Sequence, residues 1–230
     1  TGLGGSQVEV FKNGNLKISV RNLVEFMLRS GDIDNRTFTG SDINAMQEGA
    51  RLHRKIQGKM GGNYHAEVPL RMEFPFDDFA IVVEGRADGI IDGDDEKSAT
   101  IDEIKCVYTD LLFIDEPKLL HKAQAMCYGY FYGVANELEI INIQLTYVNI
   151  DTEEVKRFNE EISLRVLKNW FHDMLDAYSK WVKYLWDHKK SMQESAKKLE
   201  FPYEYRAGQR DVTVSVYKAI NRKVPLFIQA

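Results

Sequence analysis

The sequence predicts an α/β fold in which a small mixed β-sheet is flanked by α-helices. Three observations predict it. Two stretches with helical spacing of apolar residues precede a segment of short β-branched runs, a further helix and strand follow that segment, and a long amphipathic helix comes next. With 230 residues and 44% hydrophobic content, the chain is long enough to bury a substantial core. We expect one large globular domain, or one domain with an appendage.

Two helices are expected before the sheet. A short strand-like run, "LKISV", comes first, and residues 20–34 then place Leu23 and Phe26 at helical spacing before a Ser-Gly stop. Residues 39–63 keep apolar side chains at intervals of three or four positions and end at a glycine pair. Both segments therefore have one apolar face to pack against a sheet.

The sheet and its covering helices follow. Residues 66–107 consist of short apolar and β-branched runs separated by acidic turns, which indicates a hairpin-rich sheet. Residues 118–136 return to helical periodicity, and residues 139–150 are typical of a long, half-buried strand. From Glu160 to about Lys190, apolar residues form a stripe that predicts a long helix covering the sheet.

One composition break suggests a domain boundary. In "EFPYEYRAGQ" at residues 200–209, Pro202 and a cluster of aromatic residues interrupt the helical pattern. We therefore expect a first domain over residues 1–200 and a separate segment over residues 201–230. In the second segment, the pattern predicts a helix followed by a strand.

Charge and cysteine content exclude several classes of protein. The chain has 30 Lys plus Arg against 35 Asp plus Glu, so it is not a polycation that coats nucleic acid. Cys106 and Cys127 lie in apolar segments, which favours reduced, buried thiols in a cytoplasmic protein. Because no run of about 18 apolar residues and no signal-peptide pattern occurs, neither a membrane span nor export is expected.

Three stretches supply an imidazole, two acids and an amine. They contain His53, Asp88, and the pair Glu103 and Lys105. On a strand, Glu103 and Lys105 point to the same face, and burying both charges is costly unless a bound cation needs them. Carboxylates hold Mg²⁺ or Mn²⁺ while leaving room for water and a phosphate oxygen, and a nearby Lys can orient that water. This set of residues predicts phosphodiester hydrolysis.

Four motifs, in order, resemble the RecB-type branch of the PD-(D/E)XK nuclease superfamily, which includes CRISPR-associated exonucleases. They are Gly-x-x-x-His in "GARLH", Gly-Arg-x-Asp in "GRAD", Glu-x-Lys in "DEIK" and Gln-x-x-x-Tyr in "QAMCY", spread over roughly residues 20–150. The resemblance implies a restriction-endonuclease-like core with Mg²⁺ or Mn²⁺. It implies no iron–sulfur cluster, since the four cysteines that hold one in many relatives are absent.

The resemblance also implies roles for individual residues. His53, Asp88 and Glu103 would be metal ligands, and Lys105 would assist the attacking water. Gln124 and Tyr128 would shape the site and contact DNA, although a structural hydrogen-bonding role on their shared helix face is an equal alternative. Asp102 makes the register of the Glu-x-Lys motif ambiguous, and the strand pattern with its spacing to Lys105 favours Glu103.

Further side chains could contact DNA. The basic residues around His53 could follow a phosphate backbone, or could belong to an ordinary charged surface; they are Arg51, Arg54, Lys55 and Lys59. Tyr108, Phe113, Tyr130 and Tyr132 could stack on unpaired bases, although aromatic residues at this density are more often part of a core.

Residues 201–230 resemble the opening of DinG/XPD-like superfamily 2 helicases. In that family an Arg-x-x-Gln pair, here Arg206 and Gln209, precedes the first motor strand, and the Gln reads adenine. The phosphate loop Gly-x-x-x-x-Gly-Lys-Ser/Thr, which should come next, does not occur in these 230 residues, so the chain alone is not expected to hydrolyse ATP. We expect a helicase domain in cis, C-terminal to this chain.

The sequence therefore predicts a metal-dependent DNA exonuclease that acts on single strands or DNA ends, within a nuclease-helicase for DNA repair or processing. The main alternative is a non-catalytic DNA-binding module that guides DNA to a helicase motor. A third interpretation is a small-molecule phosphohydrolase, because such enzymes use similar metals.

Overall fold

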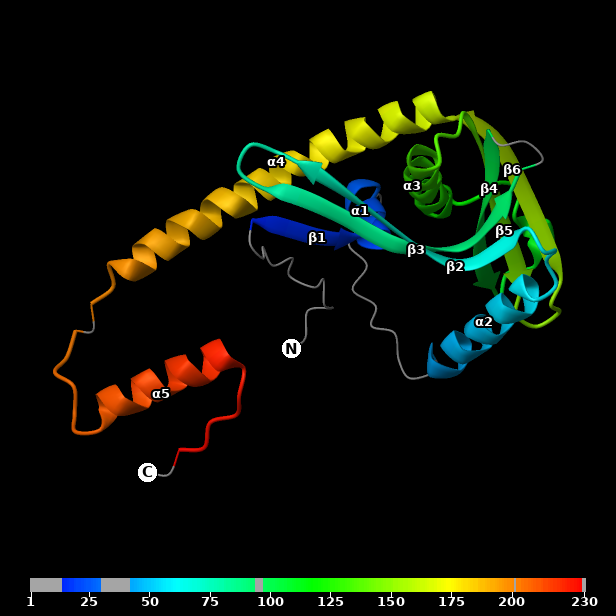
Figure 1. Cartoon of the computed structure of the whole chain (residues 1–230). Coiled ribbons are helices and arrows are strands. Elements are labelled where there is room, and N and C mark those ends of the chain that lie inside the picture. The colour runs from blue at the N-terminus through cyan, green and yellow to red at the C-terminus, as the bar shows by residue number, and fades with distance from the viewer. Residues whose placement is uncertain (1–13, 30–41, 94–96, 201, 229–230) are drawn as a thin grey trace. The chain divides into compact units, whose positions relative to one another are not determined.

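The computed structural model describes residues 14–29, 42–93, 97–200 and 202–228. The chain divides into two compact units, residues 1–186 and residues 187–230. The first unit is a mixed α/β fold with one six-stranded sheet and helices packed against it (Figure 1). This confirms the expected fold class.

The elements of the chain, in order, are β1 (Asn15–Ser19), α1 (Val20–Met27), α2 (Asp42–Gln57), β2 (Tyr64–Pro75), β3 (Ala80–Asp92), β4 (Ser98–Val107), the 3₁₀ turn η1 (Leu111–Phe113), α3 (Leu119–Ala135), β5 (Ile140–Asn149), β6 (Val155–Ser163), α4 (Leu164–Lys197) and α5 (Gln209–Arg222).

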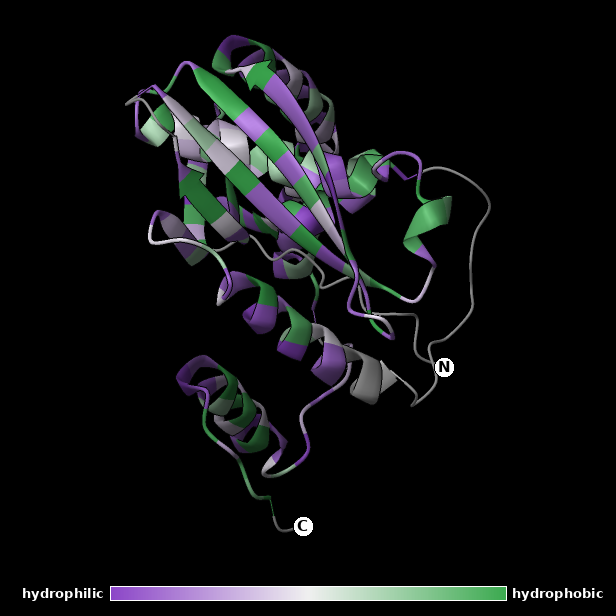
Figure 2. Cartoon of the chain, turned by 90° about the vertical axis from the view of Figure 1, so that its right-hand side faces the viewer, coloured by the Kyte–Doolittle hydropathy of each residue, from purple (hydrophilic) through white to green (hydrophobic). Residues whose placement is uncertain are grey.

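The sheet mixes parallel and antiparallel pairs. Its strand order is β1-β3-β4-β5-β6, with β2 paired to β3. The pairs β1–β3 and β4–β5 are parallel, and the pairs β2–β3, β3–β4 and β5–β6 are antiparallel. Hydrophobic and hydrophilic residues alternate along several strands in Figure 2, as expected when opposite faces of a sheet meet different surroundings.

Helices cover both faces of the sheet. On one face, α1, α3 and α4 share a large core with the strands, in which Phe131 and Phe171 are fully enclosed and pack edge to face. On the other face, Leu52 and Ile56 of α2 pack on Ile104 of β4 in a smaller cluster. Figure 1 shows α2 and α3 on opposite sides of the strands. Thus α2 places His53 on a different face from the main core.

The feature that positions the candidate site is a fork between β3 and β4. Along one edge, β3 pairs first with β1, over Ala80–Glu84, and later with β4, over Gly89–Asp92. Residues 85–88 have no partner on that edge among the described strands, and β4 beyond Asp102 pairs only with β5. The sheet therefore opens at Asp88.

Two sequence-based expectations about elements were wrong. The long helix begins at Leu164, and Glu160 lies in the edge strand β6. The strand β6 lies at the edge of the sheet, and its residues alternate between half-buried and exposed. Because many of them are charged, the sequence lacks the apolar pattern of a buried strand. At the other end of the chain, residues 224–228 are not part of a strand, although α5 occupies the expected helix.

None of the helices in the described ranges combines the length and the apolar composition of a membrane span.

Candidate active site

Asp88 lies at the fork and satisfies a backbone group that the fork leaves open. Its Oδ2 accepts a hydrogen bond of 2.8 Å from the N–H of Ile104, and its Oδ1 lies 3.7 Å from Nδ1 of His53. Burial raises the pKa of Asp88, and the charge of His53 and the hydrogen bond from Ile104 oppose that shift. The fork therefore holds Asp88 in place while its second oxygen faces an imidazole.

Glu103 and Lys105 form a buried ion pair beside Asp88. Lys105 Nζ donates to Glu103 Oε1 at 2.6 Å, which confirms that the two side chains share one face of β4. Glu103 is only 4% exposed, and its Oε2 has no hydrogen-bond partner within the described part of the chain. Burial raises the pKa of Glu103 to about 7, opposed by Lys105 and reinforced by the charge of Asp88.

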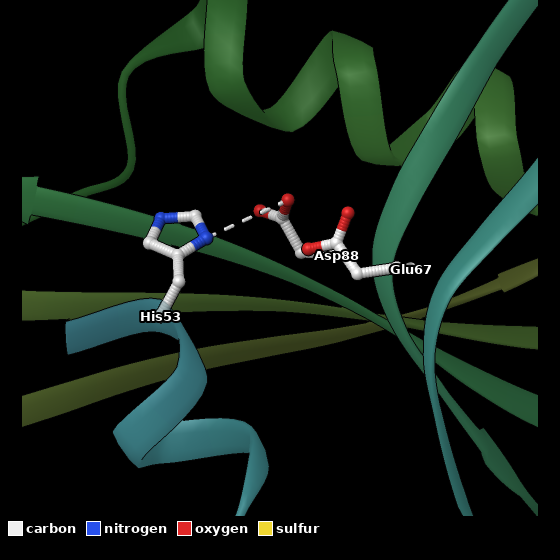
Figure 3. Close-up of side chains that lie close together, drawn as sticks. All are labelled: His53, Glu67 and Asp88. Carbon is white, nitrogen blue, oxygen red and sulfur yellow. Dashed lines mark ion pairs between the residues drawn. The ribbon is translucent and has the colours of Figure 1, made fainter. Parts of the chain in front are cut away.

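A third carboxylate, Glu67, joins His53 and Asp88. One ligand atom from each of these three residues lies within 4.8 Å of the other two. Figure 3 shows the imidazole and both carboxylates gathered from α2, β2 and β3. One imidazole and two carboxylates suit Mg²⁺ or Mn²⁺ by their chemistry. The group could therefore hold a divalent cation.

Glu67 is the residue that the sequence analysis missed. Its φ is +56°, a left-handed conformation that costs a non-glycine residue about 1 kcal/mol or more, and it lies across from Asp88. Gln57 of α2 donates to Glu67 Oε1 at 3.1 Å and to the backbone oxygen of Asp88 at 2.9 Å. Arg86 lies 3.3 Å from the other oxygen of Glu67. No residue pattern signals this conformation, so only coordinates could find it.

Gln124 and Tyr128 are both buried on α3. The Tyr128 hydroxyl approaches the backbone of β3 so closely that a Cβ added at Gly85 would lie 2.7 Å from it. Burial raises the pKa of Tyr128, and the charges of Glu103 and Asp88 add to that shift. Gly85, the glycine of "GRAD", therefore leaves the space that Tyr128 occupies beside Asp88 and Glu103. For Gln124 the structure gives the position on the helix, and its contact with DNA stays a prediction.

The two arginines predicted to bind DNA differ in their surroundings. Arg51 pairs with Glu48 at 2.7 Å and with Glu153 at 2.9 Å, and Lys55 also pairs with Glu153. Arg54 is exposed on the same helix. A phosphate would have to compete with two carboxylates for Arg51, so its contact with DNA stays a prediction.

The residues expected to contact a nucleotide belong to the second unit. Arg206 and Gln209 lie just before and at the start of α5, where Gln209 Oε1 accepts a hydrogen bond of 3.1 Å from the Arg206 N–H. Their role with a nucleotide stays a prediction. The cysteines Cys106 and Cys127 are free thiols, the first half-buried and the second buried.

Together these contacts define a mixed α/β protein whose sheet opens around an acidic group with one imidazole and one half-buried amine. No protein-family model matches the sequence, and no curated protein matches it significantly.

Solved structures similar to this chain include SSO0001, at 21% identity and a TM-score of 0.45, covering 73% of this chain and 78% of that one. They also include LHK-Exo, an alkaline exonuclease from Laribacter hongkongensis, at 14% identity and a TM-score of 0.38, covering 76% and 94%. LHK-Exo in complex with dAMP gives 15% identity and a TM-score of 0.41 over the same shares. TM-scores below 0.5 are too low to assign a function.

The raised pKa of Glu103 predicts how the stability of the metal-free protein depends on pH. Because the folded state holds the proton up to about pH 7, against 4.5 for the free side chain, stability should fall as pH rises from about 4.5 to about 7 and level off above that. Glu103→Gln should remove part of this loss, on the order of 1–3 kcal/mol between pH 5 and pH 8.

Chemical denaturation in the presence of a chelator at both pH values measures this change. Glu25→Gln, at an exposed carboxylate on α1, is the control. If the free energy of unfolding depends on pH equally in the wild type and in Glu103→Gln, the ionisation of Glu103 does not destabilise the folded protein.

Proposed function

We propose that this chain is a metal-dependent DNA exonuclease that hydrolyses phosphodiester bonds on single strands or DNA ends. The observation that carries the proposal is the convergence of Asp88, Glu103 and Lys105 at the fork, with His53 within 3.7 Å of Asp88. The order of the four sequence motifs gives independent support, since each motif falls on one of the elements around the fork.

The donor set fits a divalent cation on two grounds. Glu103 Oε2 is a buried acceptor without a partner in the described residues, and such an atom costs about 1–3 kcal/mol unless something satisfies it. His53, Glu67 and Asp88 add three ligand atoms close together. Asp88 would be shared between this group and Glu103, whose pKa its charge raises. A bound Mg²⁺ or Mn²⁺ would neutralise charge on the scissile phosphate and acidify the attacking water.

The remaining side chains would position the reactants. Lys105 Nζ is held by Glu103 near Asp88, where it could hold the attacking water by a hydrogen bond. Arg21 of α1 lies near enough to lower the pKa of Glu103, and its charge would attract a phosphate. Tyr128 fixes the distance between α3 and β3. The reaction that these groups favour is attack by water on phosphorus, with cleavage of the P–O bond to one deoxyribose oxygen, which leaves as a hydroxyl group.

Lys105→Ala tests the catalytic role. Cleavage of labelled single-stranded DNA in Mn²⁺ should fall by about 100-fold or more, because the water loses its hydrogen-bond donor, while DNA binding is retained. Lys17→Ala, at a lysine on β1 that is 60% exposed, is the control. DNA labelled at the 5′ or the 3′ end would also show from which end the enzyme degrades the strand.

Two outcomes of the same assay would reject the proposal. A wild-type protein that binds DNA tightly but cleaves none would be the non-catalytic module. Turnover of free nucleotides or simple phosphoesters, with no effect of added DNA, would indicate a small-molecule phosphohydrolase.

Glu67→Gln tests the metal group without DNA. The Kd for Mn²⁺, measured by calorimetry, should rise at least about tenfold, since one of the charged ligands is lost. Glu73→Gln is a matched control, because Glu73 lies on the same strand and its side chain is 48% exposed, against 46% for Glu67. If both variants bind Mn²⁺ equally well, Glu67 is no ligand.

We also propose that the second unit leads into a helicase motor in the same polypeptide, in a protein for DNA repair or processing. Along and after α5, Tyr217, Ile220 and Phe227 are 71%, 73% and 94% exposed, which is apolar surface available to a further domain. The parent gene should encode a Gly-x-x-x-x-Gly-Lys-Ser/Thr loop shortly after residue 230. A reading frame that continues without such a loop would contradict this proposal.

A further inference from the structure

The loop between β4 and α3 presents apolar side chains to solvent next to the candidate active site. Over residues 108–114, here the β4–α3 loop, Tyr108 is 59% exposed, and Leu112 and Phe113 are each 80% exposed. Val107, the last residue of β4, is two positions beyond Lys105, or about 7 Å along the strand. The loop therefore begins within about two nucleotide spacings of the catalytic amine.

Side-chain hydrogen bonds hold the backbone of the β4–α3 loop in place. Lys156 Nζ donates to the backbone oxygens of Leu111 and Ile114, at 3.2 and 2.7 Å. Asn149 donates to the backbone oxygen of Thr109 at 3.1 Å, and Asp110 caps the η1 turn by accepting from the Leu112 N–H at 2.9 Å. Because these hydrogen bonds fix the backbone of the loop, the exposure of Leu112 and Phe113 is a property of the folded structure.

A cavity of about 490 Å³ lies beside the loop. Phe113 contributes an exposed aromatic wall, the buried Tyr147 borders the cavity, and Glu116 and Lys118 contribute polar groups. The Tyr147 hydroxyl accepts from the Lys118 N–H at 3.0 Å and lies 2.9 Å from Nδ1 of His121, which fixes its position. The volume is in the range of small-ligand sites. An aromatic wall with a carboxylate acceptor suits a planar base that carries amino groups.

We propose that the β4–α3 loop and this cavity bind an unpaired nucleobase of the strand whose phosphate lies at the Asp88–Lys105 site, with Phe113 as the stacking partner. The inference rests on the proposed nuclease function and adds a substrate class, a strand with unstacked bases. A DNA strand whose phosphate is held at Lys105 must continue past the residues that follow Lys105 in the chain. The first exposed aromatic side chains after β4 are Tyr108 and Phe113. Stacking tolerates any base, because every base has a flat π-face.

Phe113→Ala tests the inference. The Kd for single-stranded DNA, measured by fluorescence anisotropy in Ca²⁺, should rise about 5- to 150-fold, the loss expected for one base–aromatic stack. Phe113→Trp should retain affinity, and Phe113→Leu, which is apolar but not flat, should lose it. Tyr184→Ala removes an aromatic side chain of 58% exposure on α4 and is the matched control. Unchanged melting temperatures would show that the variants fold.

An abasic scan locates the base. Single abasic sites placed one to four nucleotides from the cleaved bond should weaken wild-type binding at one position, and Phe113→Ala should add no further loss there. Additive losses would reject the stack.

Other results separate the inference from the proposed function. If the wild type binds and cleaves DNA and Phe113→Ala binds it equally well, the inference fails and the nuclease stands. If Phe113→Ala instead dissociates a dimer with no change in DNA affinity, the loop is a protein interface and the inference is wrong. A wild type that neither binds nor cleaves DNA would reject both.

Discussion

The hydrogen bond from the Ile104 N–H to Asp88 is the contact on which the arrangement of the site depends. Where β3 and β4 separate, the ladder between them ends and Ile104 is fully buried, so its N–H would cost about 1–3 kcal/mol without an acceptor. Asp88 supplies that acceptor with one oxygen, which leaves the other directed at His53. One carboxylate thus closes a structural gap and fixes the geometry of a candidate metal group.

Charge balance is the second constraint. Glu103 is buried beside the charge of Asp88, and Lys105 offsets only part of the cost, as the pKa near 7 indicates. A buried carboxylate of which one oxygen meets no partner among the described residues lowers the stability of the fold. Such a carboxylate fits the cation site that we propose. Glu67 also has an unfavourable, left-handed backbone, and Gln57 and Arg86 hold its carboxylate in place by hydrogen bonds.

Most of the fold could be predicted from the sequence, because apolar periodicity directly reflects packing. The period of two placed Glu103 and Lys105 on one face, and their contact at 2.6 Å confirms it. The strand β6 was missed, because an edge strand with charged residues on its open side lacks the pattern that marks a buried one. Glu67 was missed for a different reason, since a left-handed backbone angle at a glutamate leaves no trace in composition or spacing.

The ion pairs of Arg51 illustrate another limit. A helix pattern shows that Arg51 and Glu48 are neighbours, but Glu153 lies 102 positions away and meets Arg51 only through the packing of the chain. Conversely, the sequence left Phe113 open as a base-stacking residue or as part of a core, and only the coordinates of the β4–α3 loop show that it is exposed.

The most direct test of the account is a crystal structure of the protein soaked in Mn²⁺, with the metal located by its anomalous scattering. The account predicts a peak about 2.0–2.6 Å from both an Asp88 carboxylate oxygen and a His53 ring nitrogen, with Glu67 or Glu103 completing the ligands. A well-diffracting crystal without a peak at the fork, or with Mn²⁺ bound only at other carboxylates, would contradict it.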